Sequence, residues 1–239
     1  LTGSVIFDVV RQLQSGEQPN VEESYCNAVA QNIADGQVDK ALLAQSLELP
    51  PETYLAGQMD VIDPDNLYLA RRFVQQRVAE HLHERFWRLV QENREEGEYA
   101  ITPDAMGRRS LKNLGLSYLM AVDNPGQEVI DFCLGQYESA TNMTDRSAAL
   151  KHITDSEIHV REEILEDFFE TWRNDPLVMD KWLIIQAVSR REDTLDRVQE
   201  LMESPVFSIK NPNKVRSLIG AFCSLNHVRF HAMSGEGYA

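Results

Sequence analysis

Residues 64–93 read PDNLYLARRFVQQRVAEHLHERFWRLVQEN and indicate the fold class. Apolar side chains recur every three or four positions in this stretch, at Leu67, Ala70, Val74, Val78, Leu82, Phe86 and Leu89. Residues at this spacing share one face of an α-helix, and the opposite face carries polar and charged side chains. The spacing predicts a single amphipathic helix over residues 64–93.

Five dipeptides mark the starts of further helices, because each places a capping side chain before a proline. They are Asp63-Pro64, Thr102-Pro103, Asn124-Pro125, Asp175-Pro176 and Asn211-Pro212. The side-chain oxygen accepts a hydrogen bond from a free backbone N–H, and proline loses no hydrogen bond at the first helical position. Residues 157–172 and 177–188 are two more helical stretches, the second apolar nearly all round. The best strand candidate, residues 99–101, is too short to form a sheet.

These patterns predict an all-α fold of about a dozen helices that follow one another in antiparallel fashion. The proline-marked starts are unevenly spaced, which favours an irregular helix-pair superhelix, an α-solenoid of the HEAT or armadillo kind, over a strict repeat array. No Gly/Ser-rich or Pro-rich linker interrupts the sequence. We therefore expect residues 1–239 to form a single helical domain, and we expect it to be a piece of a longer protein, because the sequence lacks an initiating Met.

The charge balance restricts the classes of partner. The chain has 239 residues, with 23 Lys and Arg against 38 Asp and Glu, so its formal net charge is −15. That charge repels phosphate backbones and anionic lipids, so we expect neither a nucleic-acid nor a membrane partner. The three cysteines, Cys26, Cys133 and Cys223, lie far apart and have mostly small or apolar neighbours. We interpret them as buried, reduced thiols, which suit a reducing compartment and predict a cytoplasmic location.

Two groups of histidines resemble parts of a zinc site. His81 and His83 are followed by Trp87 at the position where a His-Glu-x-x-His sequence needs its second histidine. His227 and His231 have the i, i+4 spacing of two ligands, but no third ligand accompanies them. We therefore predict no metal site and no catalytic residue in this chain. An independent metalloenzyme that uses His227 and His231 stays open as an alternative.

Residues 211–222 place two cations, Lys214 and Arg216, near the start of a helix whose predicted apolar stripe is Val215, Leu218, Ile219 and Phe222. Positive charge there opposes the helix macrodipole, at a cost of about 0.3–1 kcal/mol on an exposed helix. Either a function or a fully solvated helix end would account for these cations.

The same stretch resembles a signature near the end of bacterial aminopeptidase N, a family of zinc metallopeptidases of the gluzincin group. The matching blocks are NPNKVRSLIGAF (211–222), NMTD (142–145) with AAL (148–150), LVMDKW (177–182), FHA (230–232) before GEGY (235–238), and more weakly VIDP (61–64). The blocks agree in order and spacing, and the resemblance covers about residues 30–239.

The resemblance implies that this chain is the non-catalytic, C-terminal helical domain of a zinc aminopeptidase, which removes single residues from the N-termini of peptides. In that family the helical domain covers the cavity of an upstream catalytic domain, which supplies the zinc ligands, and more helices follow. Arg216 matches a cavity-facing arginine, so the resemblance implies a substrate-binding role for it. The expected partners are the upstream catalytic domain and peptide substrates. A free-standing α-solenoid that acts as a protein-interaction adaptor stays open as a second alternative.

Overall fold

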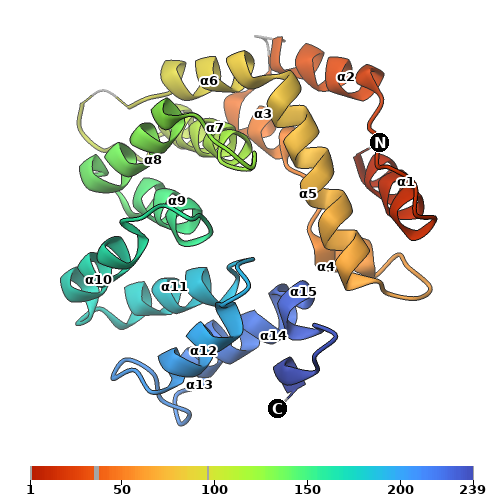
Figure 1. Cartoon of the computed structure of the whole chain (residues 1–239). Coiled ribbons are helices and arrows are strands. Elements are labelled where there is room, and N and C mark those ends of the chain that lie inside the picture. Colours follow the sequence, from red (N-terminus) through yellow and green to blue (C-terminus); the bar gives the residue numbers. More distant parts are fainter. Residues whose placement is uncertain (1, 35–37, 96, 239) are drawn as a thin grey trace. The chain divides into compact units, whose positions relative to one another are not determined.

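The structure is a computed structural model that describes residues 2–34, 38–95 and 97–238 (Figure 1). Leu1 and Ala239, the ends of the predicted domain, lie outside these ranges. The helices are, in chain order, α1 (Thr2–Gln14), α2 (Glu23–Ala34), α3 (Lys40–Leu47), α4 (Glu52–Ala56), α5 (Pro64–His81), α6 (His83–Glu92), α7 (Pro103–Leu119), α8 (Gln127–Ser139), α9 (Met143–Thr154), α10 (Arg161–Trp172), α11 (Pro176–Ala187), α12 (Thr194–Met202), α13 (Pro212–Val215), the π-helical turn η1 (Arg216–Gly220), α14 (Ala221–Leu225), α15 (His227–Phe230) and the 3₁₀ turn η2 (Glu236–Tyr238). The described residues contain no strand, so the all-helical prediction is confirmed. Within the same ranges, every helix is too short or too polar to span a lipid bilayer.

Contacts between residues divide the chain into two compact units, Leu1–Arg146 and Ser147–Ala239. The boundary falls inside α9. The single domain over residues 1–239 stays a prediction.

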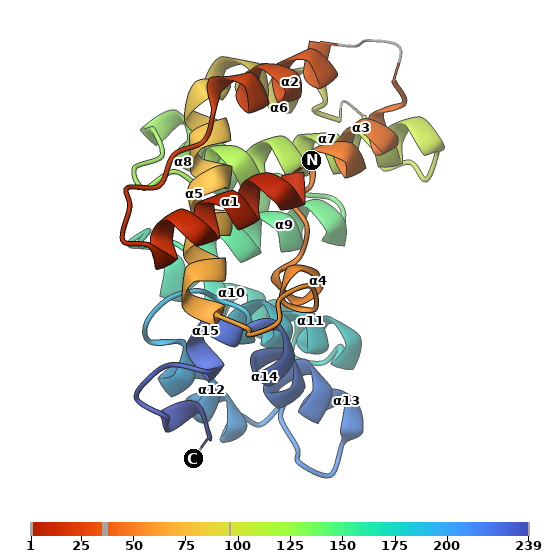
Figure 2. The same ribbon diagram turned by 90° about the vertical axis from the view of Figure 1, so that its right-hand side faces the viewer.

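In the first unit, α1 packs along α5, and α7 packs against both α3 and α6 (Figures 1 and 2). The contact between α6 and α7 is close at Gly115, where an added Cβ would lie 2.9 Å from Val90 Cγ2 and 3.3 Å from the Phe86 carbonyl oxygen. One turn later, the rings of Phe86 and Tyr118 stack with their centroids 4.3 Å apart. The Tyr118 hydroxyl donates a hydrogen bond to the Leu47 carbonyl (2.7 Å), which ties α7 to the end of α3.

An ion pair lies inside the first unit between Lys112 on α7 and Asp145 on α9. Lys112 Nζ is 2.7 Å from Asp145 Oδ2, and both residues are buried. The Asn113 amide donates to the other carboxylate oxygen (2.8 Å). Asn142 caps α9, because its side-chain oxygen accepts from the Asp145 backbone N–H (2.9 Å) while its amide donates to Oδ2 (3.1 Å). The pair is therefore surrounded by the hydrogen bonds that a buried charge requires.

Four of the five predicted proline-marked starts are confirmed. The side chains of Asp63, Thr102, Asp175 and Asn211 each accept a backbone N–H bond at the start of their helices. The prediction at Asn124-Pro125 is wrong, because Gly126 is still extended (ψ 151°) and is the N-cap of α8, which begins at Gln127.

The single helix predicted over residues 64–93 is also wrong. It is divided at Leu82 (φ −116°, ψ 21°), where α5 ends and α6 begins. The apolar spacing continues through the buried Leu82, so periodicity gives no sign of the break. Packing explains the break, because α5 packs mainly against α1, whereas α6 packs mainly against α7.

In the second unit, α11 is the inner helix that its apolar composition predicts. Met179, Leu183 and Ala187 are buried along it, and the Trp182 indole N–H donates to the Leu165 carbonyl of α10 (3.2 Å). Only one edge, with Leu177 and Ile184, is exposed. Helix α10 begins at Arg161, later than the predicted stretch that starts at residue 157.

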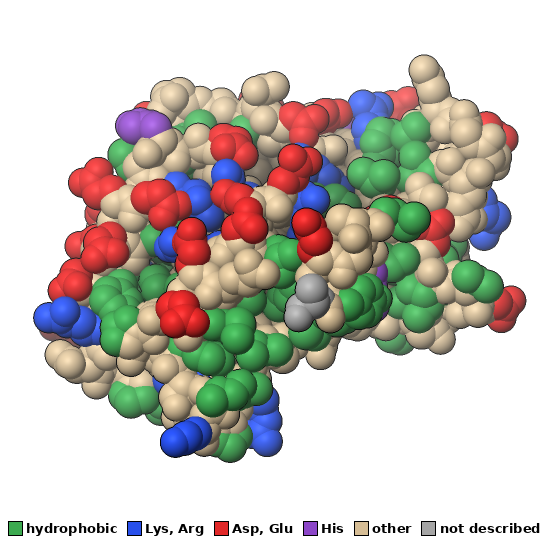
Figure 3. All heavy atoms as spheres, turned by 60° about the horizontal axis from the view of Figure 1, so that its bottom comes forward, with side chains coloured by type: hydrophobic (Ala, Val, Ile, Leu, Met, Phe, Trp, Pro, Cys, Tyr) green, Lys and Arg blue, Asp and Glu red, His purple; other side chains and the backbone are tan. Residues whose placement is uncertain are grey.

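None of the three cysteines, all of which the structure describes, forms a disulfide. Cys26 and Cys133 are buried as predicted, and Cys223 is half-buried. Burial raises the pKa of the Cys133 thiol to about 12, so this thiol is unreactive at neutral pH. On the face shown in Figure 3, acidic side chains are spread over the surface among fewer basic ones, in keeping with the net charge.

Candidate functional site

Arg216 is the residue for which the sequence predicts a substrate contact, and it is the first residue of η1. The segment begins as predicted, since Asn211 caps α13 by accepting from the Asn213 N–H (3.0 Å). After one α-helical turn the backbone widens into the π-helical turn, a feature often found at functional sites. The Arg216 side chain is exposed.

The residues on either side of Arg216 fix its backbone. Lys214, Ser217 and Leu218 are buried, Leu218 completely, and η1 packs against α11. The Arg216 side chain itself forms no hydrogen bond or ion pair within the part of the chain that the structure describes. Its guanidinium group therefore leaves its N–H donors available beside buried neighbours, and a carboxylate or carbonyl oxygen is the acceptor that such a fork fits.

The sequence suggested either a function or a solvated helix end for Lys214, and its contacts fit neither explanation. Its Nζ lies 2.7 Å from Asp180 Oδ1 and 2.7 Å from the Pro176 carbonyl oxygen, both on α11. The Lys214 side chain is 6% exposed and that of Asp180 is 16% exposed. Lys214 is thus neither at a solvated helix end nor free to bind a ligand; it joins α13 to α11.

Asn226 is a further buried polar residue in this unit, and the sequence analysis missed it. Its amide donates to the carbonyls of Ala187 (3.0 Å) and Ser189 (2.7 Å), and its oxygen accepts from Arg190 (2.7 Å). These bonds join the end of α11 to the start of α15. Asn226-His227 reads as an ordinary polar pair in the sequence, so no local signal points to this role.

The histidine pair at the end of the chain has a structural role. The rings of His227 and His231 have centroids 5.5 Å apart, and His231 Nδ1 shares a hydrogen bond with the Tyr238 hydroxyl. Gly237 lies so close to the Phe230 carbonyl that a Cβ there would overlap it. The block at residues 230–238 is therefore a turn that folds back on α15.

No group of three His, Cys, Asp or Glu side chains that could hold a metal ion occurs among residues 2–34, 38–95 and 97–238. His81 and His83 lie in different helices, at the end of α5 and the start of α6. The described residues therefore do not fit a zinc centre.

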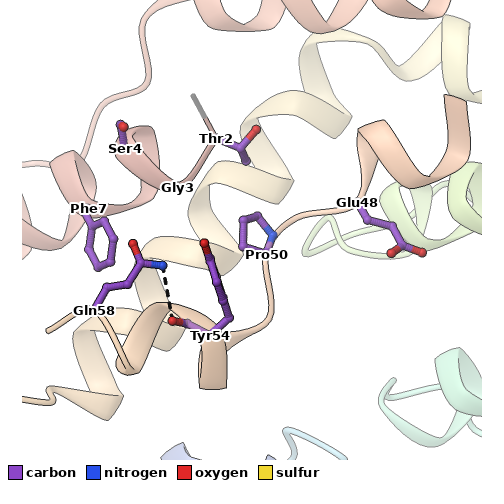
Figure 4. A pocket seen from close by; sticks show the side chains of 8 residues that line it. All are labelled: Thr2, Gly3, Ser4, Phe7, Glu48, Pro50, Tyr54 and Gln58. Atoms are coloured by element: carbon purple, nitrogen blue, oxygen red, sulfur yellow. Dashed lines mark hydrogen bonds between the residues drawn. The ribbon is translucent and has the colours of Figure 1, made fainter. Parts of the chain in front are cut away.

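A groove of about 420 Å³ lies in the first unit, apart from every predicted site residue (Figure 4). Its lining residues come from α1 and from the segment before, within and just after α4: Thr2, Gly3, Ser4, Phe7, Glu48, Pro50, Tyr54 and Gln58. It is open to solvent.

Comparison with known proteins identifies the fold. The family model DUF3458_C, a domain of unknown function described as ARM repeats, matches residues 1–239. A crystal structure of Legionella pneumophila aminopeptidase A in complex with aspartic acid superposes with a TM-score of 0.87 at 27% identity, over 99% of this chain and 28% of that one.

Three relatives bear the name Aminopeptidase N. The Haemophilus influenzae protein is 36% identical over 97% of this chain, the Caulobacter vibrioides protein 37% over 91%, and the Escherichia coli protein 31% over 96%. The chain spans about a quarter of the length of each, 25–26%, and corresponds to their C-terminal part. The resemblance seen in the sequence is confirmed.

Proposed function

This chain belongs to the DUF3458_C family of ARM-repeat domains, and from that relationship we propose that it is the C-terminal helical part of an aminopeptidase. The parent enzyme removes single residues from the N-termini of peptides. The observation that carries the proposal is the similarity to three proteins named Aminopeptidase N over 91–97% of this chain.

In this proposal the chain binds peptides and keeps longer or folded ones out of the cavity, while the rest of the parent enzyme carries out the chemistry. The upstream part would hold a zinc ion, which would supply Lewis-acid activation of water there. The helical part covers the catalytic cavity and admits only short or unfolded peptides. We place the parent enzyme in the cytoplasm, since free thiols suit a reducing compartment.

The first test is activity. The parent enzyme should hydrolyse an alanyl arylamide, whereas residues 1–239 alone should fold as helix, bind no stoichiometric zinc and release no product. Turnover by the isolated chain that persists through purification and is abolished by His227→Ala would contradict the proposal and favour the metalloenzyme alternative. A free-standing adaptor gains no support from the relatives, each about four times as long as this chain.

Arg216 gives a sharper prediction about the peptide. We propose that its guanidinium group binds a carbonyl or the terminal carboxylate of a bound peptide, because it is exposed on a fixed backbone and has no partner within the described residues. Arg216→Ala in the parent enzyme should lower kcat/KM for a tetrapeptide by about 10- to 100-fold, the loss expected for charge-assisted hydrogen bonds. Arg216→Lys should recover only part of it, since lysine lacks the planar fork.

The control substrate is an alanyl arylamide, which has no residues beyond the first. Its kcat/KM should stay unchanged in Arg216→Ala. The control variant is Arg173→Ala, whose exposed side chain pairs, among the residues that the structure describes, only with Glu170 on α10. An equal loss for both substrates would show a structural effect, and no loss for either would remove Arg216 from the substrate site.

A further inference from the structure

Four apolar side chains lie exposed or half-buried at one edge of the first unit, and we call them the apolar ledge: Phe7, Tyr54, Val61 and Ile62. Val61 is 81% exposed, Tyr54 64% and Ile62 53%, while Phe7 is half-buried. A single exposed apolar side chain is ordinary on a protein surface. Several close together in one segment are typical of a surface that another molecule covers.

The loop that carries Val61 and Ile62 is held in place by Asp63. The Asp63 carboxylate accepts bonds from the Asn66 N–H (3.1 Å), the Asn66 amide (2.8 Å) and the Gln14 amide at the end of α1 (2.8 Å). Burial opposes ionisation of Asp63, but the bonds from Gln14 and Asn66 outweigh it and hold its pKa below the usual range. The two β-branched side chains are therefore presented from a fixed loop, which reduces the entropy lost on binding.

The apolar ledge continues into the groove of the first unit. In Figure 4, Gln58 lies between the Phe7 and Tyr54 side chains, and its amide donates to the Tyr54 carbonyl. Val61 follows Gln58 by three residues, so at most about 11 Å of backbone separates them. The ledge therefore adjoins the groove, whose lining is more polar than apolar and which shares Phe7 and Tyr54 with the ledge.

The edge of this surface is acidic. Glu48 lines the groove and Asp60 precedes Val61; both are exposed, and neither forms an ion pair with another described residue. The chain as a whole carries a net charge of −15. A surface that covers the ledge therefore has complementary charge if Lys and Arg surround its apolar centre.

The relatives indicate which molecule covers it. They are about four times as long as this chain, which matches their C-terminal part, so most of their polypeptide precedes α1. Thr2, Gly3 and Ser4 of α1 line the groove. The preceding polypeptide of the parent protein therefore joins this chain beside the apolar ledge.

We propose that the apolar ledge is the docking surface for the upstream part of the same parent protein. The upstream part then carries an apolar recess, bordered by Lys and Arg, into which the ledge fits. The proposal rests on the proposed function only in that a catalytic part precedes this chain. It does not depend on control of peptide access.

The test uses the parent protein with a protease recognition sequence inserted before Leu1. After cleavage, the 239-residue chain should stay bound to the upstream part, and the dissociation constant can be measured by sedimentation. Val61→Asp with Ile62→Asp should raise that constant by about 100-fold, since each buried aliphatic side chain contributes about tenfold or more. Tyr54→Ser is a second, independent variant, expected to weaken binding by about tenfold.

The control is Ile101→Asp, which places one aspartate, half the added charge of the double variant, at another exposed apolar position of the first unit (75% exposed). It should bind as tightly as the unaltered chain. Circular dichroism verifies the helical fold of each variant. Equal binding by the ledge variants and the control would overturn the proposal. Because the readout is association, it is independent of the activity assays that test the proposed function.

Salt dependence tests the predicted basic border. Reversing the two acidic charges, with Glu48→Lys and Asp60→Lys, should weaken binding at low salt and have little effect at high salt, where exposed charges are screened. Stronger binding by this variant at low salt would contradict a basic recess and overturn that part of the proposal.

Discussion

We expect Lys112→Met to lower the free energy of unfolding of the first unit by about 3–5 kcal/mol. The methionine fills a similar volume but leaves the Asp145 carboxylate without its cation at a buried position. The Asn113 and Asn142 amides still donate to that carboxylate, but neutral donors do not compensate a full charge. In a domain of this size, the loss corresponds to a melting temperature lower by roughly 6–20 °C.

Thermal unfolding followed by far-UV circular dichroism measures this effect. The matched control is Lys40→Met, which removes an exposed ion pair to Asp104 (3.5 Å) in the same unit and should cost at most about 1 kcal/mol. The double variant Lys112→Met with Asp145→Leu should lose less than the two single changes added together, because it removes both charges. Equal melting of Lys112→Met and Lys40→Met would show that the buried pair contributes no more than a surface one.

The second large effect is expected at Lys214. Lys214→Met should destabilise the second unit by about 3–5 kcal/mol, because it leaves the Asp180 carboxylate without its cation and the Pro176 carbonyl without its hydrogen-bond donor. The matched control is Lys181→Met, one residue after Asp180 on the exposed side of α11, which should change stability by less than about 0.5 kcal/mol.

The Lys214 variant also tests the link to Arg216. Since Lys214 joins α13 to α11 two residues before Arg216, its loss should loosen the backbone that presents the guanidinium group. Hydrogen exchange of the backbone amides in residues 213–220 should become faster in Lys214→Met and stay unchanged in Lys181→Met. Unchanged exchange in both variants would contradict a positioning role for Lys214.

Much of the helical architecture could be predicted from the sequence, since capping side chains and apolar stripes are local signals. Asp63, Thr102, Asp175 and Asn211 cap helices where expected. The break at Leu82 could not be predicted, because nothing in the neighbouring residues weakens the helix there and the cause is contact with α1 and α7.

The orientation of the helix around Arg216 was predicted one residue out of register. The predicted stripe was Val215, Leu218, Ile219 and Phe222, whereas the structure buries Lys214, Ser217, Leu218, Ala221 and Phe222. Both sets have helical spacing. The error arises because two buried positions carry polar side chains, and a count of apolar residues overlooks a lysine whose charge is neutralised by a distant aspartate.

Contacts with residues distant in the sequence also limit how much of the candidate site could be predicted. Arg216 could be proposed from its place in a family-like block, but the contacts of its neighbours could not. In this structure, residues of the matching blocks hold helices together: Asp145 pairs with Lys112, Asp180 pairs with Lys214, and Tyr238 bonds to His231. The resemblance therefore identifies the scaffold more directly than it identifies residues that touch a substrate.

The difference in burial among the three thiols has a practical consequence. Cys26 and Cys133 are enclosed, so Cys223 is the most accessible thiol of this chain, three residues after η1. Burial raises the Cys223 pKa as well, so mildly alkaline conditions favour its alkylation. A fluorophore or spin label attached there would sit close to Arg216 and, under the proposed function, would report on peptide entry without any engineered cysteine in this part of the molecule.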